Sequence, residues 1–172
     1  MIPDATLNDV QKKARENTTQ SNVDKPNTAP QKNNAVIPEQ LLRNLYRRQK
    51  DENTFMVERA KIVDACYALH QAGFEHLTMI TTIDWKKRWE VLYHLTKFGR
   101  KDLVVLRVEL PYHDPTIPSV TNIWVGAGWH ERENYDLMGI KFTGNSDLRR
   151  ILLPQDYEGF PLRKEVKYGN TS

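Results

Sequence analysis

The sequence predicts an α+β fold, in which helices precede a small and mostly antiparallel sheet. Apolar residues recur at helical spacing in the first half of the aromatic-containing region, and segments that alternate or are rich in β-branched residues follow. Short polar links separate the later segments, as hairpin turns do. The chain has 172 residues, and because domains usually hold roughly 100–200 residues, we expect one folded domain.

The first 35 residues differ in composition from the rest of the chain. They contain no aromatic residue, and their larger aliphatic residues are Ile2, Leu7, Val10 and Val23. Such a segment buries too little apolar area to offset an ordering entropy of about 1–2 kcal/mol per residue. We therefore expect residues 1–35 to be either a disordered tail or a segment that orders along a partner, with Leu7 and Val10 opening a short helix.

Two helices are expected at the start of the folded domain, which we place at residues 36–142. Pro38 suits a first helical position, and the apolar residues after it at helical spacing are Leu41, Leu42 and Leu45. A second helix is expected from about Val57 to Ala72, with Gly73 as its C-terminal cap. Its buried stripe is expected to contain Ile62, Val63, Cys66, Tyr67 and Leu69. Cys66 is thereby interpreted as a core residue.

Three strands are expected after the helices. Residues 76–84 are rich in threonine and isoleucine, residues 89–96 alternate between large and polar side chains, and residues 103–110 are almost continuously aliphatic. The links at residues 85–88 and 97–102 have the length of hairpin loops. This pattern predicts an antiparallel meander.

Prolines mark a break after the third strand, at Pro111, Pro115 and Pro118. Ser119 is a good N-cap for a short helix that runs through Trp124. A further helix is expected from Trp129 to Met138, closed by Gly139. Residues 143–172 are charged and punctuated by proline and glycine, so we expect an extended C-terminal segment.

The cysteine and histidine content excludes several kinds of redox centre. Cys66 is the sole cysteine, whereas a disulfide needs two thiols and an iron–sulfur cluster normally needs about four. The five histidines show no close metal-ligand spacing. No apolar run approaches the roughly 20 residues of a spanning helix, and no apolar stretch of a signal peptide follows Met1. We expect a soluble, intracellular protein with no cofactor or metal of its own.

Two short motifs resemble known sites but lack a required residue. Gly126-Ala127-Gly128 resembles a dinucleotide-binding turn, yet Glu131 stands where the third glycine belongs and would place a carboxylate against the pyrophosphate. His130-Glu131 begins like a zinc-protease motif, but Asn134 replaces the second histidine. Neither motif predicts a catalytic site.

Two other functions are considered as alternatives. Asp84, His94 and Glu131 would give a stand-alone enzyme a set of titratable groups if the fold brought them together. A formal charge of +3 would suit a nucleic-acid-binding module, but the pairs Arg149-Arg150 and Arg163-Lys164 are flanked by acids, whereas a phosphate-tracking surface needs a net positive stripe. We expect no nucleic-acid partner.

Three linked motifs lie between residues 131 and 164. The first contains Glu131, Arg132, Glu133, Tyr135, Asp136, Gly139 and Ile140. The second contains Asp147, Leu148, Arg149, Arg150, Ile151, Leu152 and Pro154. The third contains Gly159, Pro161, Leu162, Arg163 and Lys164. In this order they strongly resemble the signature of the C subunit of the respiratory complex I family of quinone oxidoreductases.

The resemblance implies a non-catalytic subunit in the peripheral arm of a membrane-bound, ion-translocating complex. Its partners would be the quinone-site subunit, which is similar to a hydrogenase large subunit, and the small iron–sulfur subunit. The clusters and the quinone-type acceptor would then reside on those partners, and the chain would reach the cytoplasmic face of the membrane only through the complex. The electron donor stays open between NADH, reduced F420 and ferredoxin.

The extended C-terminal segment is the expected partner-binding region. Extended backbone leaves amide groups that need partners from elsewhere. The guanidinium groups of Arg149, Arg150 and Arg163 match carboxylates bidentately, and the apolar anchors between them would be Leu148, Ile151, Leu152 and Leu162. The alternative is that these arginines pair with Glu131, Asp136 or Asp147 inside the chain, and the sequence leaves both interpretations open.

Overall fold

A computed structural model describes residues 46–47, 53–100 and 102–166 of the chain. All of these residues belong to one compact unit, Asn33–Ser172. The helix predicted around Leu41 and Leu45 is expected to end among the basic residues Arg47, Arg48 and Lys50. It lies outside the described residues except at Tyr46 and Arg47, where the prediction is wrong. There Tyr46–Arg47 forms a strand, β1, which pairs with the next strand in the chain.

A five-stranded sheet of order β1-β2-β5-β4-β3 forms the centre of the fold. Its remaining strands are β2 (Thr54–Met56), β3 (His76–Asp84), β4 (Arg88–Thr96) and β5 (Leu103–Pro111). Strands β3, β4 and β5 pair antiparallel, which confirms the predicted meander. Strand β2 pairs parallel with β5, an addition that the sequence does not predict.

The second predicted helix is shorter than expected. A single 3-10 turn, η1 (Arg59–Lys61), precedes α3 (Ile62–Gln71). The helix starts late because the Val57 amide still pairs with the sheet, where it donates to the Arg107 carbonyl at 2.8 Å. The chain ends the helix at Gly73, whose φ of 89° lies in the left-handed region. Cys66 is fully buried, as predicted, but Tyr67 is 58% exposed and does not belong to the buried stripe.

One face of the sheet and the two helices enclose the hydrophobic core. Alternate residues of β4 point into it and are fully buried, namely Trp89, Val91, Tyr93 and Leu95. Helix α3 contributes Ile62, Ala65, Cys66 and Leu69, and α4 (Ala127–Met138) adds Ala127 and Met138. Burying one large aliphatic side chain stabilises a fold by about 1.5–3 kcal/mol, so this face fixes the positions of both helices.

The connection after β5 contains no helix, contrary to the prediction at Ser119. The short strand β6 (Thr116–Pro118) pairs parallel with β7 (Lys141–Thr143). Between them the Ser119 hydroxyl accepts the Thr121 amide at 3.2 Å, and the Trp124 amide donates to the Val120 carbonyl at 3.1 Å. The hydroxyl therefore caps a tight turn rather than a helix.

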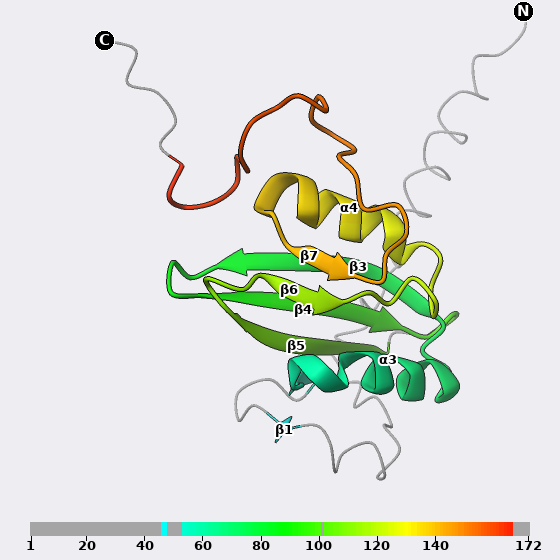
Figure 1. Cartoon of the computed structure of the whole chain (residues 1–172). Helices are drawn as coiled ribbons and strands as arrows, with labels where there is room; N and C mark the ends of the chain where they lie inside the picture. The colour runs from blue at the N-terminus through cyan, green and yellow to red at the C-terminus, as the bar shows by residue number, and fades with distance from the viewer. Residues whose placement is uncertain (1–45, 48–52, 101, 167–172) are drawn as a thin grey trace, which may run out of the picture. The chain divides into compact units, whose positions relative to one another are not determined.

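Helix α4 begins two residues earlier than predicted and ends where predicted, at Gly139. Gly139 has a φ of 76°, and its amide donates to the Tyr135 carbonyl at 2.9 Å. A Cβ atom at this position would lie 2.7 Å from the Phe160 ring and would collide with the Arg163 guanidinium. Beyond β7 the chain runs back past α4 without regular secondary structure (Figure 1).

Candidate functional site

The candidate site is the contact between α4 and residues 147–166 of the predicted extended region 143–172. From here on, the C-terminal segment means residues 147–166. Asp136, which is fully buried on α4, accepts the backbone amides of Ile151, Leu152 and Leu153 at 2.7–3.0 Å. Arg150 donates to the same carboxylate at 2.7 Å. One side chain of the helix thus binds three consecutive amides of the segment.

The environment of Asp136 favours its ionised form. Burial raises the pKa of this carboxyl group, but the hydrogen bonds from Leu153, Arg150, Ile151 and Leu152 together outweigh burial and lower the pKa to about 2. The carboxylate therefore carries its negative charge at neutral pH, which strengthens each of these hydrogen bonds.

Arg150 is bound inside the chain. Its guanidinium donates to the Asp136 side chain and, at 3.1 Å, to the Asp136 carbonyl. It also reaches the carbonyl oxygens of Tyr157 and Gly159 at 2.7 and 3.0 Å. The Tyr157 and Gly159 carbonyls close residues 150–159 into a loop, and the two acceptors on Asp136 attach this loop to α4. The intramolecular alternative therefore holds for this arginine.

Arg132 and Arg149 differ in burial although they share one acidic partner. Arg132 of α4 donates to the carbonyls of Arg149 and Arg150 at 3.2 and 3.1 Å and lies 3.6 Å from the Asp147 carboxylate. The Arg149 side chain pairs with Asp147 at 2.7 Å but is 65% exposed. Of these two arginines, Arg132 holds the segment and Arg149 faces solvent.

Arg163 fastens the far end of the C-terminal segment to the end of α4. Its Nε donates to the Met138 carbonyl at 2.8 Å, and the neighbouring Leu162 amide donates to the Leu137 carbonyl at 3.0 Å. The guanidinium also lies over the rings of Trp89 and Phe160, at 5.3 and 4.5 Å from their centroids. Arg163 therefore binds a main-chain carbonyl of its own chain rather than Glu131, Asp136 or Asp147, and its contact with a partner stays a prediction.

Tyr135 is half-buried and packs edge-on against Phe160, with ring centroids 6.1 Å apart. Phe160 thus lies between Tyr135 and Arg163 and against the bare backbone of Gly139. The sequence motif marks Gly139 and Arg163 but not Phe160, because an aromatic residue in a polar segment carries no signal of the surface it covers.

Glu131 is fully buried on α4 and binds two loops, the one that follows β6 and the one that follows β7. It accepts the Val120 amide, the Ser119 hydroxyl and the Asn145 amide group, each at 2.8 Å. Burial raises the pKa of this carboxyl group although the three hydrogen bonds oppose the rise. Sequence reasoning does not find Ser119 and Asn145 as partners, because both lie in loops more than ten residues from Glu131.

The enzyme alternative needs Asp84, His94 and Glu131 to meet, and the structure separates Asp84 from His94. Asp84 ends β3 opposite Trp89, whereas His94 lies five residues further along β4, which is about 17 Å of strand. The Asp84 carboxylate accepts the amides of Lys86 and Lys164 at 2.6 and 2.9 Å. Asp84 and Glu131 therefore bind backbone of their own chain.

The outer side of the C-terminal segment carries apolar residues. The most exposed are Leu152 and Leu162, at 61% and 56%, and Tyr157 and Val166 also face outward. Leu148 instead packs against the core, and Ile151 is half-buried. The turn at Pro154 and the left-handed Gly159 shape the loop between the leucines, and Pro161 is half-buried next to Leu162.

Within residues 46–47, 53–100 and 102–166, no group of three or more histidine, cysteine or acidic side chains is placed to hold a metal ion. None of the helices in this part of the chain is long and apolar enough to cross a membrane. The chemistry that this region does show is binding, because the buried charges of α4 fix an irregular segment whose outer side is apolar.

Fold and site together define the class: an α+β domain that holds its own C-terminal segment on a polar helix through hydrogen bonds. The family model of the respiratory-chain NADH dehydrogenase 30 kDa subunit matches residues 55–172. The chain belongs to this family. The match covers both helices, the sheet from β2 onward and the whole candidate site.

Individual relatives agree with the family. The chain is 38% identical over 141 residues to the C subunit of NADH-quinone oxidoreductase from Roseiflexus sp. (strain RS-1), covering 78% of this chain and 80% of that protein. It is 39% identical over 124 residues to the corresponding protein of Geobacter sulfurreducens, covering 69% and 76%. For the corresponding protein of Roseiflexus castenholzii the identity is 44% over 95 residues, and the match spans 55% of each protein.

Two solved structures resemble the fold. The first is a trypsin-resistant fragment of Nqo5, at 32% identity and a TM-score of 0.51, covering 55% of this chain and 81% of that chain. The second is a chain of the membrane-bound sulfane sulfur reductase, described as an archaeal respiratory membrane complex, at 25% identity and a TM-score of 0.67. It covers 75% of this chain and 82% of that one.

Proposed function

We propose that this chain is a non-catalytic, structural subunit in the peripheral arm of a membrane-bound, ion-translocating quinone oxidoreductase of the complex I family. Its C-terminal segment packs on the quinone-site subunit and on the small subunit with the terminal iron–sulfur cluster. The names of the relatives and the family support membership of such a complex.

The observation that carries this proposal is the state of the C-terminal segment. Leu152 and Leu162 are largely exposed, yet the amide of each is hydrogen-bonded to α4 or to its side chains. Segments that are ordered before binding lose less entropy when they bind. A rigid segment with outward leucines is therefore suited to permanent contact with another protein, whose obligate interfaces bury about 2,000 Å² or more.

The arrangement of charge refines how this surface works. Arg150 and Arg163 donate hydrogen bonds to carbonyl and carboxylate oxygens of their own chain. In this proposal they fix the shape of the surface, and the apolar residues make the main contacts with the partner. Arg149 and Lys164 remain exposed, and they provide the charged rim of the interface. Central apolar anchors with a polar rim are the usual anatomy of a protein–protein interface.

Electron transfer in this proposal takes place on the neighbouring subunits. This chain holds no cofactor, and the iron–sulfur clusters and the quinone-type acceptor belong to its partners. It lies on the cytoplasmic face of the membrane and is attached only through the complex. The buried acids of α4 support this view, because Glu131 and Asp136 are occupied by hydrogen bonds from backbone and side chains of the chain itself.

The test is co-purification of the full chain from solubilised membranes. The wild-type chain is expected to retain the quinone-site and iron–sulfur subunits, and the double variant Leu152→Asp, Leu162→Asp is expected to lose them. Val125→Asp is the matched control, since Val125 is a 90% exposed apolar residue just before α4. Retention of both partners by the double variant would refute the proposed interface.

The non-catalytic role is tested on the chain purified without partners. We expect no absorption from flavin or iron and no turnover of NADH or reduced F420. A coloured chain, or one that oxidises either donor unaided, would refute the structural role. In the intact complex, the donor that reduces the clusters identifies the electron-input module.

A further inference from the structure

The central sheet has a second face, opposite the hydrophobic core, and the middle of this face is shielded from solvent. Side chains alternate between the two faces of a strand, so Leu92 of β4 and Val105 of β5 point away from the core residues on either side of them. Leu92 and Val105 are only 9% and 8% exposed. Neither residue belongs to the core cluster. Two apolar side chains are therefore buried outside the core.

Polar groups on the second face are shielded in the same way. Glu90, two residues before Leu92, is fully buried. The Arg107 side chain lies 3.4 Å from the Glu90 carboxylate and is 14% exposed. The Arg107 Nε and the His94 Nδ1 are buried and have no hydrogen-bond partner among the described residues. Since even the long arginine side chain is covered, the middle of this face requires a further layer of protein above it.

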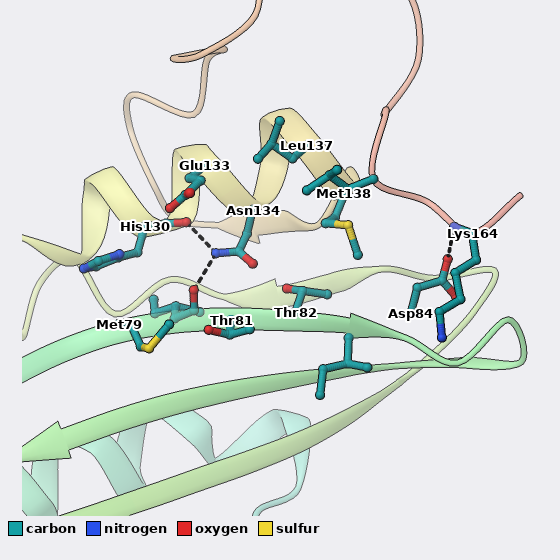
Figure 2. A pocket seen from close by; sticks show the side chains of 13 residues that line it. Met79, Thr81, Thr82, Asp84, His130, Glu133, Asn134, Leu137, Met138 and Lys164 are labelled. Atoms are coloured by element: carbon teal, nitrogen blue, oxygen red, sulfur yellow. Dashed lines mark hydrogen bonds between the residues drawn. The ribbon is translucent and has the colours of Figure 1, made fainter. Parts of the chain in front are cut away.

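The helices that the structure describes do not supply this layer. Helix α3 contributes its buried residues to the core, on the other face. Helix α4 lies beside β3 at the edge of the sheet, where the Asn134 side chain donates to the Ile80 carbonyl at 2.8 Å (Figure 2). The groove that α4 forms with β3 is lined by Met79 and Thr81 of the second face but does not extend to Leu92. The C-terminal segment is bound to α4.

The shielded area is limited to one row of residues across the strands. On the same face, Met79 and Leu103 are exposed, so the ends of the strands are open. Tyr46, the first residue of β1, lies in register with Met56, and the row continues through β5 to Leu92. The chain that precedes β1 therefore joins the sheet at the shielded row.

Residues 36–45 have the composition that a covering segment needs. Half of them are large aliphatic residues, namely Val36, Ile37, Leu41, Leu42 and Leu45. They belong to the same compact unit as the sheet. The shorter stretches outside the described residues, 48–52, 101 and 167–172, contain no aliphatic residue. Of these candidates, residues 36–45 are therefore the one able to bury apolar surface.

A short helix over residues 38–45 matches the shielded row in size. Its leucines at positions 41, 42 and 45 would share one side, because residues three and four positions apart are neighbours on a helix. Such a helix is about 12 Å long, and β2, β5 and β4 together span about 10 Å. A helix that leads into β1 can therefore cross the row as far as Leu92.

A neighbouring subunit is the alternative occupant. The low exposures of Leu92 and Val105 are those of the chain alone, so no partner is needed to bury them. The apolar part of the shielded row is also small and lies beside charged groups, whereas specific interfaces between proteins bury about 1,200 Å² or more. Both observations favour a segment of the chain itself.

We propose that residues 38–45 form a short helix on the second face of the sheet, with the three leucines packed over Leu92 and Val105. The polar residues of the helix face solvent. The helix closes the middle of the second face to neighbouring subunits, so contacts with partners are directed to other surfaces of the chain. The inference goes beyond the proposed function and does not depend on it.

Photocrosslinking of the full chain tests the position of the helix. A diazirine amino acid of similar size replaces Leu42, and mass spectrometry identifies the attached peptide. We expect attachment within one chain, to the peptide that contains Leu92 or to the peptide that contains Val105. Attachment to α3, to a second copy or to a neighbouring subunit in the intact complex, or no attachment, would overturn the inference.

Thiol labelling measures the shielding itself. Cys66 is fully buried, so an added cysteine is read against a low background. In the full chain, Leu92→Cys should react slowly with a maleimide. Leu42→Asp with Leu45→Asp should raise that rate by about tenfold or more, because loss of the covering helix opens the site locally. Protection of Leu92→Cys in the intact complex but not in the isolated full chain would identify a partner as the occupant and overturn the inference.

The matched control places the same charges elsewhere in the N-terminal part of the chain. Leu7→Asp with Val10→Asp should leave the labelling rate of Leu92→Cys unchanged, and equal rates in the two double variants would overturn the inference. Labelling of Cys66 reports unfolding of the domain. If the first double variant exposes Cys66, Leu42→Ala replaces it and should raise the rate by about threefold. No rise in that variant would equally overturn the inference.

Discussion

The two helices hold the same domain together by different means. The buried residues of α3 are Ile62, Ala65, Cys66 and Leu69, all of them apolar or nearly so. Helix α4 buries Glu131, Asn134 and Asp136, and these side chains bind loops, a strand edge and the C-terminal segment. Helix α3 therefore stabilises the sheet, whereas α4 fixes the positions of the loops after β6 and β7 and of the C-terminal segment.

Apolar burial in α3 and buried hydrogen bonds in α4 respond differently to amino-acid substitution. Apolar burial is non-directional and scales with area, so it tolerates replacement by residues of similar volume. A buried carboxylate fixes each donor in direction, and it is costly when a donor is lost. Damage to α3 should therefore weaken the whole fold, and damage to α4 should release a specific segment.

The strongest destabilisation is expected for Leu69→Ala in α3. Leu69 is fully buried in the core, and removing such a side chain costs about 2–5 kcal/mol. Urea unfolding should show one cooperative transition at a lower midpoint, with the sheet and the C-terminal segment lost together. A separate early loss of the segment would contradict the division between the helices.

Asp136→Asn in α4 comes next, with an expected cost of about 1.5–3 kcal/mol, because hydrogen bonds to charged groups are the stronger ones. The loss should be local. Limited proteolysis should cut near Leu152 at a much higher rate, while the main unfolding transition moves less than in Leu69→Ala. An unchanged cleavage rate would show that Asp136 does not hold the segment.

The two acids of α4 should give opposite pH dependences. The pKa of Asp136 is lowered from 3.8 to about 2, so its stabilisation is complete above about pH 4 and is lost as the pH falls towards 2. The full loss amounts to about 2 kcal/mol. The pKa of Glu131 is raised above 4.5, so the native state binds more protons there, and stability falls as the pH rises through that raised value.

Single substitutions separate these contributions in chemical denaturation across about pH 2–7. Glu131→Gln should reduce the fall in the free energy of unfolding above pH 4.5 and leave the fall below about pH 4 unchanged. Asp136→Asn should reduce the fall in the free energy of unfolding below about pH 4 and leave the fall above pH 4.5 unchanged. Parallel curves for wild type and both variants would show that neither carboxyl group is perturbed in this way.

A slight change is expected for Arg149→Ala, next to the bound Arg150. Exposed ion pairs such as Arg149–Asp147 contribute about 0–1 kcal/mol. The thermal midpoint of the isolated chain should therefore move little, whereas Arg150→Ala should lower it clearly through loss of its hydrogen bonds to Asp136, Tyr157 and Gly159. Equal shifts for the two variants would contradict their different burial.

The same contrast explains which parts of the structure the sequence predicts. The bounds of β3 match the predicted residues, and β4 and β5 extend them by one residue, because alternation and β-branched content follow directly from the pleat of a strand. Helical spacing identifies Cys66 and Leu69 as core residues, and both are fully buried. Apolar periodicity reports burial on regular elements, so α3 and the meander are accessible from the sequence.

The other features, strand β2 and the contacts of α4 with the C-terminal segment, depend on long-range contacts that the spacing of apolar residues does not predict. Strand β2 has three residues and pairs with residues of β5 that lie 51 positions later, so local composition gives little signal. The burial of Asp136 depends on amides from an irregular segment fifteen to seventeen residues later. The motif marks Asp136 and Arg150 as important, but the intramolecular role of Arg163 needs the position of the Met138 carbonyl.

The left-handed end of α4 has a consequence for a truncated protein. Carbonyls in the last turn of a helix lack partners within it, and here Leu137 and Met138 receive theirs from Leu162 and Arg163. A chain cleaved before residue 160 would leave those two oxygens without their partners, although Asp136 would still hold the Leu152 amide. If the proposed function is correct, such a truncated molecule would keep one apolar anchor of the interface, Leu152, and lose the other, Leu162.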